Sequence, residues 1–162
     1  MLKPNFKFNR VTDISVSFLK ENGIDALLLD VDNTIITYKG DNLIEGFKAF
    51  KEELEQNGIK LLILSNGKSE RLKKTAQKAE IEYLPMALKP LPFKYLKAIK
   101  ILKATKKSTA IVGDQIFTDI LGGNIVGIKT ILLKPIKLET TISFKIRRYF
   151  ENKLLSAWER GK

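Results

Sequence analysis

The stretch Ala26-Leu27-Leu28-Leu29-Asp30-Val31-Asp32-Asn33-Thr34 decides the fold of this chain. Its apolar run predicts a buried strand, and the two carboxylates that follow stand two positions apart. Both therefore emerge at the carboxyl edge of a sheet, where open α/β sheets bind ligands. Two negative charges this close are costly unless a cation or a phosphoryl group uses them. We therefore predict that Asp30 is a nucleophile and that Asp32 is its acid/base partner.

Short apolar runs alternate with amphipathic segments along the rest of the chain. Residues 1–23 are expected to form an irregular arm with one short helix, capped by Thr12 or Asp13. Alternating strands and helices imply βαβ units, whose right-handed crossovers put all strand carboxyl ends on one edge. The predicted fold class is a three-layer, Rossmann-like α/β domain with about five parallel strands. Strands are expected over 26–31, 59–64, 81–84, 109–112 and 129–133, and helices over 14–22, 43–56, 69–79, 92–103, 117–126 and 140–158.

The composition narrows the chemistry that this chain can perform. Its 162 residues suffice for one domain with a sizeable core, so residues 1–162 are expected to fold as a single unit. The chain has no cysteine and no histidine. This excludes disulfides, thiolate and imidazole metal sites, cysteine nucleophiles and Ser-His-Asp triads. Carboxylates, lysines and hydroxyl groups are left as reactive side chains.

The formal net charge of +11 favours anionic partners: phosphorylated metabolites, nucleic acid or anionic lipid surfaces. No apolar run approaches the roughly 20 residues that a membrane span needs. The first residues also lack the apolar core of a signal peptide. A cytoplasmic protein is expected, and peripheral association with a membrane stays open.

Four polar signals follow predicted strands or lie in loops at the same edge of the sheet. Parallel topology would bring all four into one crevice. There, carboxylates can hold Mg²⁺, which prefers oxygen ligands, while a hydroxyl, backbone amides and a lysine can bind phosphate. This combination predicts phosphoryl transfer, which depends on positioning and electrostatic stabilisation. The four signals are 30–34 (DVDNT), 65–67 (SNG), 87–90 (ALKP) and 113–119 (GDQIFTD).

Each signal taken alone has a less specific interpretation. The first is also typical of a turn. It does not fit a calcium loop, because Ile35 stands where glycine is required and Asp41 where glutamate is required. Ser65 alone is typical of a helix cap, and Lys89 alone of a solvated surface lysine. The order and the strand-end placement of all four favour the functional interpretation.

Together the four signals resemble the motifs of the haloacid dehalogenase (HAD) superfamily over residues 25–134. The run 113–124 is similar to that of the YqeG-like phosphatases of subfamily IIIA, a wider group that includes phosphatidylglycerophosphate phosphatases. The resemblance implies a HAD-like fold. The matching residues are Asp30, Asp32 and Thr34 in the first motif, Ser65 in the second, Lys89 in the third, and Gly113, Asp114 and Asp119 in the fourth.

The resemblance also implies a role for each of these residues. Asp30 would form an aspartyl-phosphate, while Asp32 would protonate the leaving group and then activate water. Mg²⁺ would be held by Asp30, the main-chain carbonyl of Asp32 and Asp114, with Gly113 and Asp119 in support. Thr34, Ser65, Asn66 and Lys89 would bind the phosphoryl group.

The intervals between the motifs are short. Residues 34–65 hold one loop, one helix and one strand, and residues 66–89 hold one helix and a short strand. Neither interval has room for a cap domain, so the site is expected to be open. An open site suits a phosphate that is presented by something large, such as a protein, a nucleic acid end or a lipid headgroup.

The C-terminal segment 140–162 is basic and amphipathic. Residues 134–162 carry eight Lys or Arg against three Glu, and aromatic residues lie between them. This pattern suits a helix at an anionic membrane surface, but also a terminal helix that packs on the domain. Three functions remain: a phosphatase for a phosphatidylglycerophosphate-type headgroup, a phosphatase for a soluble or nucleic-acid phosphomonoester, and a non-catalytic phosphate-binding module. Nucleic acid is disfavoured, because no aromatic stacking platform can be placed in the sequence.

Overall fold

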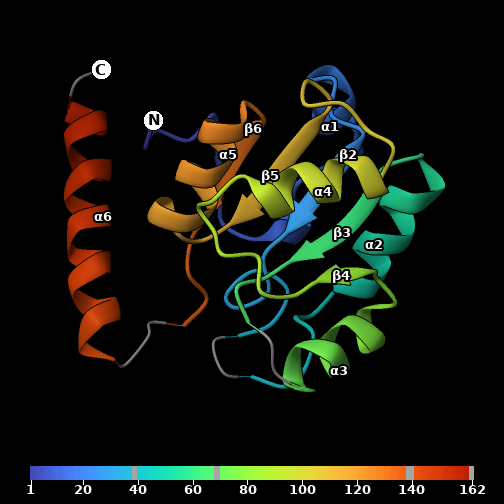
Figure 1. Ribbon diagram of the computed structural model, residues 1–162, viewed down its shortest axis with the longest axis horizontal. Helices are drawn as coiled ribbons and strands as arrows, with labels where there is room; N and C mark the ends of the chain where they lie inside the picture. The colour runs from blue at the N-terminus through green and yellow to red at the C-terminus, as the bar shows by residue number, and fades with distance from the viewer. Residues whose placement is uncertain (38–39, 68–69, 138–140, 161–162) are drawn as a thin grey trace.

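The computed structural model describes residues 1–37, 40–67, 70–137 and 141–160. Its described residues form one six-stranded sheet in the order β1-β6-β5-β2-β3-β4, and every pair of neighbouring strands is parallel (Figure 1). All six carboxyl ends therefore lie on one edge, as predicted. The strands are β1 (Phe6–Phe8), β2 (Ala26–Leu29), β3 (Lys60–Leu64), β4 (Tyr83–Leu84), β5 (Thr109–Gly113) and β6 (Lys129–Leu133).

Helices cover both faces of the sheet, because the inner strands are apolar on both sides. In β2, Leu27 and Leu29 pack in one core cluster, and Leu28 packs in the other. The first cluster lies under α1 (Val16–Glu21), α2 (Phe47–Gln56) and α3 (Glu70–Ala79), and the second under α4 (Phe93–Ile101) and α5 (Leu121–Val126). The three-layer α/β fold is therefore confirmed, and the described residues contain no cap domain.

Strand β1 is one of two short elements that the sequence analysis missed, the other being the 3₁₀ turn η1 (Val11–Asp13). Strand β1 lies in the expected irregular arm and pairs with β6, with Phe6 opposite Ile131. Asn5 fixes this edge, because its side-chain oxygen accepts hydrogen bonds from the backbone N–H and the hydroxyl of Thr130, at 2.8 and 3.0 Å. Three residues are too few for a periodicity signal, so the prediction of five strands falls one short.

Helix starts are displaced from the predicted positions, and a local feature accompanies three of these displacements. Ser15, not Thr12 or Asp13, caps α1 by accepting the N–H of Phe18 at 3.1 Å. Helix α2 begins at Phe47 rather than at residue 43. Gly46, the residue before it, has a positive φ of 77°, so the right-handed helix cannot extend to residues before Gly46. The segment predicted as one helix over 117–126 begins as a single π-helical turn, Ile116–Ile120, and continues as α5.

Helix α6 (Ile142–Arg160) lies beside the sheet rather than in either of its covering layers (Figure 1). Its Leu155 and Trp158 pack against a small third cluster of Ile116, Ile120 and Leu132. No helix among the described residues is both long enough and apolar enough to cross a membrane. The side of α6 away from this cluster carries a stripe of exposed apolar side chains, called here the outer stripe: Ile142, Ile146, Tyr149 and Phe150.

Candidate active site

Three carboxylates converge at the carboxyl edge of the sheet. Asp30 follows β2, Asp114 follows β5, and Asp119 lies in the π-helical turn after β5. One oxygen from each lies within 4.8 Å of the others, and all three residues are buried. Buried carboxylates this close repel one another, so positive charge is required among them.

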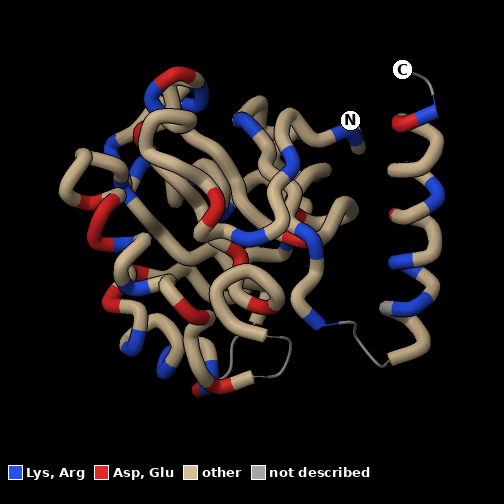
Figure 2. Tube along the Cα trace, turned by 180° about the vertical axis from the view of Figure 1, so that it is seen from behind, with Lys and Arg blue, Asp and Glu red and all other residues tan. Residues whose placement is uncertain are grey.

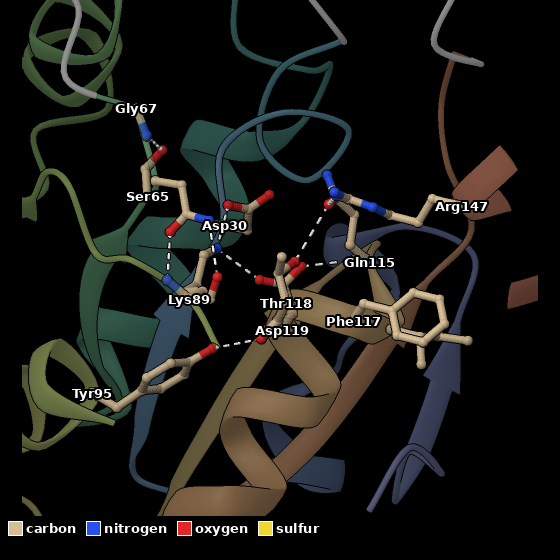
Figure 3. Close-up of polar contacts among 12 residues, drawn as sticks. Asp30, Ser65, Gly67, Lys89, Tyr95, Gln115, Phe117, Thr118, Asp119 and Arg147 are labelled. Atoms are coloured by element: carbon tan, nitrogen blue, oxygen red, sulfur yellow. Dashed lines mark hydrogen bonds and ion pairs between the residues drawn. The ribbon is translucent and has the colours of Figure 1, made fainter. Parts of the chain in front are cut away.

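Lys89 supplies part of that positive charge. Its Nζ donates to Oδ1 of Asp30 and to Oδ1 of Asp119, at 2.6 Å in each case (Figure 3). Burial raises the pKa of Asp30 to about 7, although the ammonium of Lys89 opposes this rise. Burial lowers the pKa of Lys89, but the charges of Asp119 and Asp30 outweigh burial and raise that pKa above its usual value. Lys89 is therefore a permanent cation at the floor of the site.

Asn66 holds Lys89 in this position. Its side-chain oxygen accepts the backbone N–H of Lys89 at 2.7 Å, and its amide nitrogen donates to the Lys89 carbonyl at 3.3 Å. Asn66 was expected to bind the substrate; the contacts seen here are structural, and they fix the third motif against the second. The neighbouring Ser65 hydroxyl accepts the backbone N–H of Gly67 at 3.1 Å.

Gly113 permits the close approach of Asp119. A Cβ atom at this position would stand 2.2 Å from Oδ2 of Asp119, so any other residue would displace the carboxylate. The same Oδ2 accepts the backbone N–H of Gln115 at 3.2 Å. Asp119 therefore positions Lys89 and the loop after β5, in addition to lying in the carboxylate cluster.

Asp32 pairs with Arg71, whereas Asp30 pairs with Lys89. Both oxygens of Asp32 accept from Nη2 of Arg71, at 2.9 and 3.1 Å, and Arg71 also donates to the Gly40 carbonyl at 3.1 Å. The side chain of Asp32 is about a third exposed, at 30%. The clustered carboxylates are those of Asp30, Asp114 and Asp119, whereas the expected metal set included the main-chain carbonyl of Asp32. Arg71 was missed because its helix presented only a general excess of Lys and Arg.

The first and second motifs border a cavity of about 350 Å³. Thr34, expected to bind substrate, is fully buried beside it, and its hydroxyl has no hydrogen-bond partner among the described residues. This places Thr34 under the loop rather than on the cavity wall. The wall is formed by Asp30, Asp32, Ser65, Asn66, Gly67, Lys89, Gln115, Thr118 and Arg147.

Helix α6 adds residues that the sequence analysis did not place in the site. Arg148 forms an ion pair with the Asp114 carboxylate and donates to the Asp114 carbonyl at 2.5 Å. Glu151, which pairs with Arg148, also accepts the backbone N–H of Ile116 at 2.8 Å. Arg147 donates to Oε1 of Gln115 at 2.8 Å. The sequence showed these arginines only as part of a basic segment, and no local signal indicated where the segment docks.

The donor set fits a divalent cation. Asp30, Asp114 and Asp119 offer carboxylate oxygens, which hard divalent cations prefer. Lys89 and Arg148 bring two positive charges against these three carboxylates, so the cluster has a net negative charge when Asp30 is ionised. The residues that would hold the ion are these three aspartates.

The fold and the site define an α/β enzyme with a carboxylate-rich centre at the topological edge of its sheet. Residues 12–127 match the family model of the haloacid dehalogenase-like hydrolases, and the chain belongs to this family. The predicted membership of the superfamily is thereby confirmed, as is the prediction of a phosphatase-type enzyme.

The chain is also similar to individual proteins. The chain is 29% identical over 157 residues to the Bacillus subtilis (strain 168) protein named "Probable phosphatase YqeG", covering 97% of this chain and 91% of that protein. The cobalt-bound deoxy-D-mannose-octulosonate 8-phosphate phosphatase of Haemophilus influenzae has a similar structure, with a TM-score of 0.59 and 17% identity over 79% of this chain and 77% of that one. A subfamily III A hydrolase of Legionella pneumophila gives a TM-score of 0.57 at 18% identity, over 74% and 70% of the two chains.

Proposed function

We propose that this protein is a Mg²⁺-dependent phosphomonoester hydrolase that forms an aspartyl-phosphate on Asp30, and that its substrate is a phosphatidylglycerophosphate-type lipid headgroup. The observation that carries the chemistry is the buried Asp30–Lys89–Asp119 unit at the carboxyl edge of the sheet. It presents a carboxylate to an open cavity and keeps a fixed cation behind it. The unit 1–162 acts as one domain, with α6 as part of the site.

In the first half-reaction the Asp30 carboxylate attacks phosphorus. Oδ1 accepts the hydrogen bond of Lys89, so Oδ2 is the attacking atom. The Oδ2–P bond forms as the bond between phosphorus and the ester oxygen breaks, and Asp32 gives its proton to the leaving oxygen. In the resting site both oxygens of Asp32 accept from Arg71, so one of them leaves this contact to carry the proton, and the other stays held by the guanidinium.

In the second half-reaction water attacks the aspartyl-phosphate. Asp32, now ionised, accepts a proton from the water, and the Oδ2–P bond breaks to release inorganic phosphate and restore Asp30. Ser65 and the backbone amides of the first and second motifs bind the phosphoryl oxygens in both steps. A magnesium ion bound by the three aspartates would supply positive charge that stabilises the phosphoryl group in the transition state.

The lipid substrate is supported by the surroundings of the site. A cavity of about 730 Å³ lies next to Asp114, between α6 and the β1–β6 edge. Its wall combines apolar side chains, such as Phe8 and Leu155, with the lysines Lys7 and Lys134. The outer stripe of α6 is exposed as well. An exposed apolar stripe with basic flanks suits an anionic membrane surface, so we place the protein at the periphery of a membrane.

A second candidate is a phosphatase for a small sugar-acid phosphate. It is favoured by the similar structure from Haemophilus influenzae, which is named for a sugar-acid 8-phosphate. Its bound cobalt also supports a divalent metal in this chain. The two candidates share the site and the chemistry, and they differ only in what carries the phosphate.

The test combines a nucleophile variant with a panel of substrates. Purified protein should release phosphate from an aryl phosphate when Mg²⁺ is present and should lose this activity with a chelator. Asp30→Asn should reduce turnover by at least about a thousandfold, because the amide cannot form the covalent intermediate. Phosphatidylglycerophosphate presented in vesicles should be hydrolysed with a higher kcat/KM than sugar phosphates.

Full activity in a folded Asp30→Asn protein would exclude the covalent mechanism. A preference for sugar phosphates over the lipid would replace the first candidate with the second. Circular dichroism and thermal unfolding of the variant show whether its fold is retained.

A further inference from the structure

The loop that carries Lys89 also exposes apolar side chains at the border of the catalytic cavity. Five large apolar residues of the span 86–96 are exposed, by fractions that range from 43% for Leu96 to 72% for Phe93. Single exposed apolar residues are normal on a protein surface, whereas a group of them beside a site marks an interaction surface. These five residues, called here the rim patch, are Met86, Leu88, Leu91, Phe93 and Leu96.

The backbone of the loop turns these side chains outward. Met86 and Leu88 have positive φ angles of 51° and 52°, a left-handed conformation that costs free energy for bulky residues. The residues that alternate with them, Ala87 and Lys89, are buried. The loop therefore places Lys89 in the site and, in the same short stretch, two apolar side chains on the surface.

Backbone hydrogen bonds fix the loop in this conformation. The N–H of Met86 donates to the carbonyl of Gly67, and the N–H of Ala87 donates to the carbonyl of Ser65, at 2.9 Å in each case. Both acceptors belong to the second motif. The exposure of the rim patch is therefore set by contacts with the site itself, and it does not result from loose packing of a surface loop.

The surroundings of the rim patch are basic. Residues 83–113 contain seven lysines and neither Asp nor Glu. Helix α4 begins at the carboxyl edge of the sheet with Phe93, and the exposed Lys97 and Lys100 follow on the same side of the helix, one and two turns further from the site. Apolar side chains that are backed by lysines in this way suit the interface of an anionic membrane.

An anionic membrane fits this surface better than a second copy of the chain does. A symmetric contact between two copies would place the lysines around one rim patch against those around the other, and like charges repel. Lipid headgroups offer the opposite charge, and the acyl layer accepts the apolar side chains. The outer stripe of α6 borders the same cavity, because Ile146, like Leu88, is directly followed in the sequence by a residue of the cavity wall.

We propose that the rim patch, together with the outer stripe, enters the interfacial layer of an anionic membrane, so that the catalytic cavity opens directly onto the lipid headgroups. This inference rests on the proposed lipid phosphatase function, and it names the surface through which the site reaches its substrate. The acyl chains of the substrate remain in the membrane, and only the terminal phosphomonoester enters the cavity and meets Asp30.

A fluorescent label on the rim patch tests the contact directly. The chain has no cysteine, so Phe93→Cys provides a single thiol for a nitrobenzoxadiazole label, whose emission rises when it passes from water into lipid. Vesicles of phosphatidylglycerol and phosphatidylcholine in equal parts should raise this emission several-fold, and nitroxide-labelled lipid should quench it. Gln56→Cys is the matched control, because Gln56 is exposed at the end of α2, on the opposite edge of the sheet. Its label should keep the emission that it has in water.

A pair of substitutions measures what the contact does for catalysis. Leu91→Gln with Phe93→Gln should lower kcat/KM for phosphatidylglycerophosphate in the same vesicles by about tenfold, because less of the protein is held at the membrane that contains the substrate. Hydrolysis of a soluble aryl phosphate should be unchanged, since neither residue lines the cavity. Ile125→Gln removes an exposed apolar side chain from α5 instead, and it should alter neither rate.

A label at position 93 that stays in water when vesicles are present at low salt would overturn the proposal. Equal losses on the lipid and on the aryl phosphate in the paired variant would overturn it as well, because the two residues would then serve the chemistry or the fold. A rise in emission with protein concentration in the absence of vesicles would assign the rim patch to a second copy of the chain, against the proposal. If the label enters lipid but the wild type hydrolyses neither phosphate, the membrane contact stands and the proposed function fails.

Discussion

At the scale of single residues, the proposed chemistry depends on Asp30, a carboxylate that is buried beside two others. Burial raises the pKa of Asp30 from 3.8 to about 7 when no metal is bound. The folded protein thus holds this proton more tightly than the unfolded chain does. The contribution of Asp30 to stability is full below about pH 4 and is lost as the pH rises through about 7.

Metal-free protein should therefore lose stability between pH 5 and pH 8 because of this residue. The loss is on the order of a few kcal/mol, since each pKa unit corresponds to about 1.4 kcal/mol. Asp30→Asn should remove most of this pH dependence. Urea unfolding in the presence of a chelator measures the free energy of unfolding of the wild type and of Asp30→Asn at pH 5 and at pH 8. The same pH dependence in both proteins would contradict the assignment.

The four strand-end signals could be predicted because their chemistry is local. Asp30, Ser65 and Asp114 each follow a buried strand, and parallel topology alone brings strand ends together. Arg71 and Arg147 could not be predicted as site residues. Their contacts depend on how α3 and α6 are rotated and docked, and the sequence of a charged helix face does not specify this.

At the scale of elements, the C-terminal helix α6 contacts the carboxylate cluster. Arg148 pairs with Asp114, which is also one of the three oxygen donors for a divalent cation. Two cations beside one carboxylate repel each other, so metal binding and the Arg148 contact oppose one another.

Arg148→Gln should therefore bind Mg²⁺ several-fold more tightly than the wild type, and α6 should dock less firmly. Calorimetric titration measures the affinity, and Trp158 fluorescence measures docking. Lys145→Gln provides a control on the same helix, because Lys145 is exposed. A lower Mg²⁺ affinity in Arg148→Gln would show that the arginine supports the metal site instead of competing with it.

The two interpretations of the C-terminal segment are not mutually exclusive in the structure. One side of α6 packs on the domain through Leu155 and Trp158, and the other side carries the exposed outer stripe. Periodicity could predict an amphipathic helix here, but not which side docks. The reason is that apolar residues lie on both sides, and the third cluster on the domain is too small to leave a signal in the sequence.

At the scale of the whole molecule, the excess of Lys and Arg is spread over both the domain and α6 (Figure 2). Such a field attracts anionic surfaces from any direction. Orientation on a membrane would then come from the outer stripe, because apolar contact requires this one side of α6 to face the lipid.

Replacing two residues of the outer stripe tests this orientation. Ile146→Gln with Phe150→Gln should weaken binding to anionic vesicles by several-fold, because both side chains are about half exposed and lose only apolar contact with lipid. Hydrolysis of an aryl phosphate should be unaffected. Sedimentation with vesicles at low and at physiological salt measures the binding, and a wild-type protein that ignores anionic vesicles in both would exclude membrane docking.

The pairing of β1 with β6 sets the order in which the protein can be completed during synthesis. The ribosome makes β1 first, but Asn5 meets Thr130 across a sequence separation of 125 residues. A nascent chain that has emerged only as far as α5 can assemble β2 to β5. It leaves the free edge of β5 and the backbone of β1 without strand partners, although Phe6 and Phe8 can already pack on Phe18. The last strand to be made therefore joins the first strand to the rest of the sheet, and a chain that ends before β6 lacks both strands.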